Sequence, residues 1–301
     1  MRFADATEHR VEVPGAAQPS TASIDESRPA VTLHDGTAYV TAAEGLRAVD
    51  TVTGSTRWTA PTKYQAEQDG FGTLRAAPRI VAHGARAMVF AAWERTVPGE
   101  GTSPSRSVIE VLGVDAATGK TRWHVEVEPD PSRGDDDLAA DGILAPKIAA
   151  ADDATVVLTA QETTYAFDRG TQALRWKKQR FHAVTMAGGV IAGAAAEGYD
   201  DRRITGLDAA SGKQRWNSSR GAGTNAASPA GPGLLAADGE AQLLILDAAT
   251  GTTRATHPHT ARHYEPWRCR YDARAVVVCW DPFGGQPNAL VAFDSTTGSK
   301  L

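Results

Sequence analysis

A short phrase recurs down this chain and constrains its fold more than any other feature. It consists of an apolar stretch, Asp, two small or polar residues, Thr or Ser, Gly, two variable residues, Arg and Trp. Full copies cover residues 48–58, 113–123 and 206–216, and weaker copies cover 166–176, 246–251 and 293–298. The repeated Asp residues are about 40 to 65 residues apart, which is the interval of a four-stranded propeller blade. The sequence therefore predicts a repeat protein.

Each residue type in the phrase has a structural reason. The apolar stretch ends a strand, Asp can accept hydrogen bonds from backbone N–H groups two residues on, and Gly supplies the positive φ of a tight turn. The Trp begins the next strand, where its ring can bury about 200 Å² between neighbouring blades. The intervals hold short β-branched runs and no helical periodicity. The motif residues are Asp50, Gly54, Trp58, Asp115, Gly119, Trp123, Asp168, Trp176, Asp208, Gly212, Trp216, Asp247, Gly251, Asp294 and Gly298.

The phrase resembles the tryptophan-docking repeat of the quinoprotein-like, or PQQ-like, β-propellers over about residues 28–301. The resemblance implies an all-β fold, a β-propeller of four-stranded blades. It does not imply a chemistry, because the family includes alcohol and glucose dehydrogenases, outer-membrane assembly lipoproteins and the sensor halves of some receptor kinases.

The six copies predict six blades in a single domain over residues 1–301, with the repeat blades in 28–301. The last copy ends where its outer strand should begin, and residues 9–13 resemble the outer strand at 122–127. We therefore expect residues 1–14 to supply a strand that closes the ring, because an open edge leaves unpaired backbone groups. The alternative is that the chain is a piece of a ring of seven or eight blades.

Composition limits the classes of partner. The chain has 22% charged residues and a net charge of −5, so we expect no general attraction to nucleic acid or acidic lipid. Its longest weakly polar stretch, residues 186–196, is too short to span a bilayer, and residues 1–10 do not resemble an export signal. We expect a monomer.

The two cysteines bear on the cellular compartment. Cys269 and Cys279 flank a plausible tight connection at residues 271–274, which would place them opposite each other on a hairpin. A cross-strand disulfide is the expectation, and two buried thiols are the alternative. A disulfide would favour an extracytoplasmic or cell-envelope location. The alternative is a cytoplasmic location.

Three histidines form the most suggestive polar cluster. His257 and His259 alternate along an extended segment and His263 follows, so the three could bind zinc or copper. A surface loop with scattered histidines is the alternative.

Catalytic signatures are absent from the sequence. It contains no nucleophile elbow, zinc-protease helix motif, Walker phosphate loop or Cys-x-x-Cys cluster, so no catalytic residue is predicted. The function expected is a non-catalytic scaffold or sensor domain. The alternative is a pyrroloquinoline-quinone-dependent dehydrogenase. Resemblance to those enzymes implies eight blades, longer insertions and, in many members, adjacent cysteines, so we assign no quinone or calcium ligands.

Five long loops interrupt the blade pattern, at residues 59–75, 94–106, 129–145, 194–202 and 281–288. Inserted loops on a propeller gather at its faces, and aromatic residues there bind proteins or peptides well. We expect such a ligand at the loop-bearing face. The alternative is that these aromatic residues pack under their own loops. They are Tyr64, Phe71, Trp93, Tyr199, Trp280 and Phe283.

Overall fold

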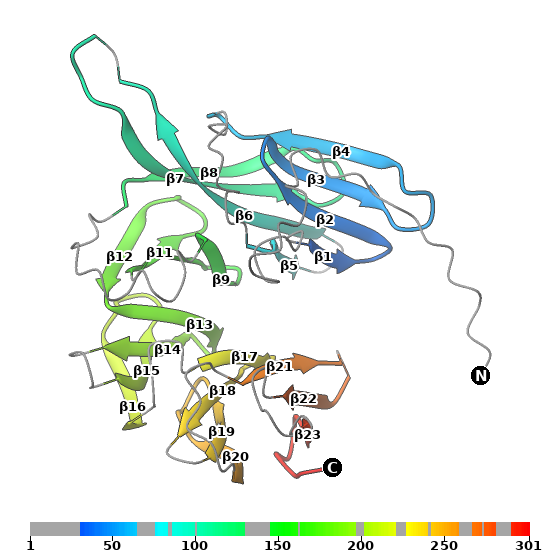
Figure 1. The fold of residues 1–301 in the computed structure, drawn as a ribbon, viewed down its shortest axis with the longest axis vertical. Helices are drawn as coiled ribbons and strands as arrows, with labels where there is room; N and C mark the ends of the chain where they lie inside the picture. The colour runs from blue at the N-terminus through cyan, green and yellow to red at the C-terminus, as the bar shows by residue number, and fades with distance from the viewer. Residues whose placement is uncertain are drawn as a thin grey trace, which may run out of the picture. The chain divides into compact units, whose positions relative to one another are not determined.

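The chain folds into antiparallel β-sheets (Figure 1). The computed structural model describes residues 31–64, 76–83, 86–99, 101–129, 145–161, 163–196, 202–220, 227–239, 242–258, 267–272, 274–280 and 290–301. All regular secondary structure within these ranges consists of strands, so the all-β prediction is confirmed. No helix in these ranges is long and apolar enough to cross a membrane. The predicted closing strand, in residues 1–14, lies outside the described part of the chain.

The described residues up to Ile148 form one compact unit with two sheets. Sheet 1 consists of β1 (Val31–His34), β2 (Thr37–Ala42), β3 (Gly45–Asp50) and β4 (Thr56–Pro61). Sheet 2 consists of β5 (Arg79–His83), β6 (Arg86–Val97), β7 (Arg106–Asp115) and β8 (Thr121–Val127). Each sheet is a meander, in which strands consecutive in the sequence pair with each other.

Residues 149–301 form the second compact unit, and the first strand of its sheets, β9, begins just before the boundary. Sheet 3 consists of β9 (Lys147–Ala151), β10 (Thr155–Ala160), β11 (Thr163–Asp168) and β12 (Leu174–Gln179). Sheet 4 consists of β13 (Phe181–Ala187), β14 (Val190–Ala196), β15 (Arg202–Asp208) and β16 (Gln214–Arg220). Sheet 5 consists of β17 (Ala227–Gly231), β18 (Leu234–Gly239), β19 (Gln242–Asp247) and β20 (Thr253–Pro258). Sheet 6 consists of β21 (Arg268–Tyr271), β22 (Val276–Trp280) and β23 (Leu290–Asp294).

The four-stranded meander is the unit that the repeat spacing predicts for a propeller blade. Sheets 1 to 5 have four strands, and sheet 6 has three among the described residues. A single bridge joins Phe293 to Lys300, where a fourth strand of sheet 6 would begin. The number of blades and their union in a single domain stay predictions.

The core lies on the middle strands of each sheet. All six residues of β10 and of β18 are buried, whereas the outer strands β12 and β20 are mostly exposed. A strand covered on both faces is buried along its whole length and not only at alternate positions, as in Thr155–Ala160. Sheets 1 and 2 share one such core, which includes Tyr39, Leu46, Val89 and Leu112.

The region at residues 94–106, expected to be a loop, is largely a hairpin. Strands β6 and β7 remain paired as far as Val97 and Arg106, and the hairpin projects beyond the neighbouring strands (Figure 1). The ladder continues because alternate side chains stay buried: Trp93 and Arg95 on β6 and Val108 on β7. The expectation of a loop was wrong for residues 94–97 and 106, which lie in strands, and right for 98–99 and 101–105, which lie outside them.

Candidate functional site

The Asp of each repeated phrase organises a tight turn after the third strand of its sheet. In the first copy Asp50 Oδ1 accepts hydrogen bonds from the backbone N–H groups of Val52 (2.9 Å) and Thr53 (2.8 Å). The backbone N–H of Gly54 donates to the Asp50 carbonyl at 2.9 Å. The same backbone bond recurs in all six copies. The phrase Gly residues have φ values of 69–74°, as such a turn requires.

In four copies, those of Asp50, Asp168, Asp208 and Asp247, Arg at the seventh position after Asp pairs with the same carboxylate. Arg175 Nη2 lies 2.6 Å from Asp168 Oδ2, and Arg254 Nη2 lies 2.8 Å from Asp247 Oδ2. Hydrogen bonds from the Thr171 backbone N–H and from Arg175 lower the pKa of Asp168 from its ordinary 3.8 to about 2. The hydroxyl groups of Thr118 and Ser211 are the main causes of lowered pKa values at Asp115 and Asp208.

The lowered pKa values of these carboxylates predict that the folded protein loses stability in acid. Because the pKa of Asp168 is lower in the folded than in the unfolded state, its stabilising effect is complete above about pH 4. The effect is lost as the pH falls through about 2. We expect the melting temperature to fall between pH 5 and pH 2, and Asp168→Asn to reduce that fall while lowering the melting temperature at pH 7. Asp153→Asn, a neutralised carboxylate outside the phrase, is the control; an equal effect there would contradict this role of Asp168.

Three of the repeated Trp residues lie on the turn of the next copy. The Nε1 atoms of Trp58, Trp176 and Trp216 donate to the carbonyl groups of the residue after the next Asp, at 3.0, 3.0 and 3.2 Å. Each half-buried ring covers the next phrase Gly so closely that a Cβ atom there would lie 2.6–2.9 Å from ring atoms. These indoles join successive sheets within each unit.

The remaining copies depart from this arrangement. Trp123 is 2% exposed and packs inside its own sheet, edge-on to Phe90 with 5.8 Å between ring centroids. The third copy has Gln172 in place of Gly, yet Gln172 adopts the same left-handed conformation (φ 64°). The fifth copy has Ala255 where the first four copies have Trp.

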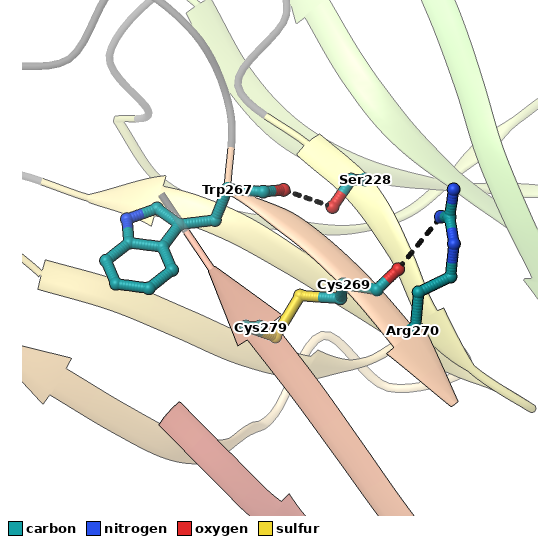
Figure 2. The surroundings of a disulfide bond; sticks show 5 residues. All are labelled: Ser228, Trp267, Cys269, Arg270 and Cys279. Carbon is teal, nitrogen blue, oxygen red and sulfur yellow. Dashed lines mark hydrogen bonds between the residues drawn. A yellow bond between two sulfur atoms is a disulfide. The ribbon is translucent and has the colours of Figure 1, made fainter. Parts of the chain in front are cut away.

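Trp267 provides a buried indole in the region where the fifth copy lacks one. It lies directly before β21, is 2% exposed and contacts His257 of β20 edge-on, with 6.2 Å between ring centroids. Its carbonyl accepts a hydrogen bond of 2.6 Å from the Ser228 hydroxyl group of β17 (Figure 2). The repeat pattern did not reveal this residue, because it lies outside the phrase.

The predicted disulfide is present beside Trp267. Cys269 and Cys279 lie directly opposite each other on β21 and β22 and are bonded (Figure 2). Both are buried in the core that sheets 5 and 6 share, with Leu243, Val277 and Phe293. The bond therefore links two strands that are already hydrogen-bonded neighbours in the last sheet.

Removing this disulfide should destabilise the protein. The sequence separation is 10 residues, and closing a loop of that size in the unfolded chain corresponds to about 2–3 kcal/mol. We expect Cys269→Ala/Cys279→Ala to lose that amount in urea denaturation, and the reduced wild type to lose a similar amount. Iodoacetamide should label no thiol in the unreduced, unfolded protein. Equal stability of the oxidised and reduced forms would contradict this contribution.

The predicted metal ligands are only partly within the described structure. His257 lies on β20 against the ring of Trp267, whereas His259 and His263 lie outside the described residues. Among the residues described, no three His, Cys, Asp or Glu side chains gather as a metal site would require. The three-histidine site stays a prediction, and no cofactor ligands are assigned.

A buried polar cluster connects Lys63 and Tyr64, which follow sheet 1 in the chain, with sheet 2. Glu110 is fully buried, accepts a hydrogen bond of 2.7 Å from the Lys63 backbone N–H, and lies 3.2 Å from His124 Nε2. The Lys63 ammonium group lies 2.7 Å from Glu126, and the Tyr64 hydroxyl group donates to Glu126 at 2.8 Å. Because neighbouring groups occupy these carboxylates, we assign the cluster a structural role.

The aromatic residues expected at the binding face differ in where they lie and in how far they are buried. Trp93 is buried and donates to the Ala42 carbonyl at 2.9 Å, so it joins sheets 1 and 2 and is not an exposed binding residue. Tyr64 belongs to the polar cluster above. Trp280 is half-buried beneath the Arg270 guanidinium, 5.8 Å from it. Phe71, Tyr199 and Phe283 lie outside the described residues.

A pocket of about 460 Å³ lies where the first strands of sheets 1 and 2 meet. Thr32, Leu33 and His34 of β1 form one wall. Pro78, Arg79 and Ile80, at the start of β5, form the other. No residue of this pocket was identified by sequence reasoning, because its walls are 46 residues apart in the chain and carry no shared motif.

Comparisons with known proteins identify a family. The family model described as outer membrane protein assembly factor BamB matches residues 107–301. A crystal structure of BamB from Moraxella catarrhalis aligns with 13% sequence identity over 81% of this chain and 78% of that chain, with a TM-score of 0.39. No curated protein matches the chain.

Proposed function

This chain belongs to the PQQ-like family described as outer membrane protein assembly factor BamB, and from that premise we propose that it is a non-catalytic protein-binding scaffold of the cell envelope. The match over residues 107–301 is the observation that carries the proposal, because an assembly factor acts by contacting other proteins. The chain's partner is proposed to bind at the face that carries its long connections.

The disulfide supports a location outside the cytoplasm. Disulfides persist in oxidising compartments such as the periplasm and are rare where thioredoxin and glutathione keep thiols reduced. Cys269 and Cys279 are bonded within the core of sheets 5 and 6, as expected of a structural disulfide. A cell-envelope scaffold would keep this bond in its working state.

The β6–β7 hairpin supports a protein-binding role. Its tip, residues 101–105, is exposed and projects beyond sheet 2, while its base is fixed by the buried Trp93 and Arg95 (Figure 1). The buried base fixes where the exposed polar tip is presented to a partner.

Site-specific photo-crosslinking in intact cells tests this function. A benzophenone amino acid at Thr102 on the hairpin tip, or at the exposed Val52 of the first turn, should produce discrete adducts with envelope proteins. The same residue at the fully buried Val157 is the control and should give none. Absence of protein adducts from both exposed positions would contradict the scaffold proposal.

A further inference from the structure

The pocket between β1 and β5 is a candidate binding site. Its volume of about 460 Å³ is within the range of 300–1,000 Å³ typical of ligand pockets. The Thr32 hydroxyl group donates to the Pro78 carbonyl at 2.6 Å, and this hydrogen bond connects the β1 wall of the pocket with the β5 wall. The Trp58 contact with the Ala116 carbonyl joins the same two sheets elsewhere. The walls are therefore held in place without a ligand.

Arg79 is a cation without a partner in this pocket. Its side chain is exposed, and it makes no hydrogen bond or ion pair within the described part of the chain. A guanidinium matches the two oxygen atoms of a carboxylate, with which it can form two parallel charge-assisted hydrogen bonds.

An apolar surface lies beside that charge. Leu33 is 70% exposed, and the half-buried Ile80 lines the opposite wall. The ligand that fits both features carries a carboxylate and an apolar group close together.

We propose that this pocket binds an acidic side chain of an otherwise apolar, extended segment of a partner protein. Arg79 receives the carboxylate, and Leu33 and Ile80 contact the flanking apolar side chains. The inference deepens the proposed scaffold function and rests on it, because it names the kind of protein segment that the scaffold recognises.

A peptide array tests the proposal with defined probes. The array holds blocked octapeptides of Leu, Ile and Val with a central Glu, Gln or phosphoserine, and it is probed with the full chain. The Glu peptides should bind about ten- to hundredfold more tightly than their Gln counterparts, as expected for a charge-assisted bidentate contact. Arg79→Met should remove the preference, and Arg79→Lys should retain part of it.

The control is Arg86→Met, which neutralises another exposed Arg of sheet 2 outside the pocket and should leave the preference intact. Leu33→Ala should weaken binding of the Glu and Gln peptides alike, because it removes the apolar contact. Equal binding of the Glu and Gln peptides, a preference that persists in Arg79→Met, or tighter binding of phosphoserine would overturn the proposal. If any of these results were obtained and Thr102 still formed photo-crosslinks, the scaffold function would stand and only the proposed pocket site would be rejected.

Discussion

Trp123→Ala should lower the free energy of unfolding by about 3–5 kcal/mol, as expected for truncation of a fully buried indole. The ring packs edge-on to Phe90, and Gly113 lies directly opposite Trp123 on β7. A Cβ atom on Gly113 would lie less than 3 Å from both the Phe90 ring and the Trp123 side chain, so these two side chains fill the space over Gly113. Removing the indole therefore leaves a cavity that neighbouring side chains cannot occupy. Urea denaturation followed by far-UV circular dichroism measures the effect.

The matched control is Trp58→Ala, at the same position of the repeated phrase. Trp58 is only half-buried, because its ring lies across the turn of the next copy near the surface. We expect this substitution to cost less than Trp123→Ala, since part of the ring already contacts water. A loss below about 1 kcal/mol at Trp123, or a larger loss at Trp58, would contradict the packing described for the second sheet.

The elements that could be predicted from the sequence depend on local contacts. Asp50 receives its hydrogen bonds from residues two and three positions away, so the turn can be recognised within the phrase itself. The opposite placement of Cys269 and Cys279 follows from a short connection between two strands. Period-two strands and the Gly conformation are likewise encoded over a few residues.

The features that could not be predicted depend on contacts between distant residues. Trp267 contacts His257 from outside the repeated phrase, and Trp123 packs on Phe90 of its own sheet although it occupies the docking position. Arg79 lies in a pocket only because β1 and β5 meet. Trp93 has the sequence context of a loop margin, and its burial follows from how sheets 1 and 2 pack. Such placements need the packing of whole sheets.

Gly251→Ala should lower the free energy of unfolding by about 2–5 kcal/mol, because two costs add. Gly251 has φ +72°, a conformation that costs an L-residue about 1–2 kcal/mol. The new Cβ atom would lie 2.6 Å from the Trp216 ring, and relieving such overpacking costs about 1–3 kcal/mol more. Thermal and urea denaturation of the purified variant measure the sum.

A double-mutant cycle separates these costs and tests the docking contact itself. When Trp216→Ala has removed the ring, Gly251→Ala should cost only the backbone term, so the two substitutions should be less than additive by about 1–3 kcal/mol. Gly101→Ala provides the control for the backbone term alone, since Gly101 has φ +62° and a Cβ atom added there would have no neighbouring atom within 4 Å. It should cost the same with and without Trp216. Additive effects of Gly251→Ala and Trp216→Ala would show that this indole does not hold neighbouring copies together.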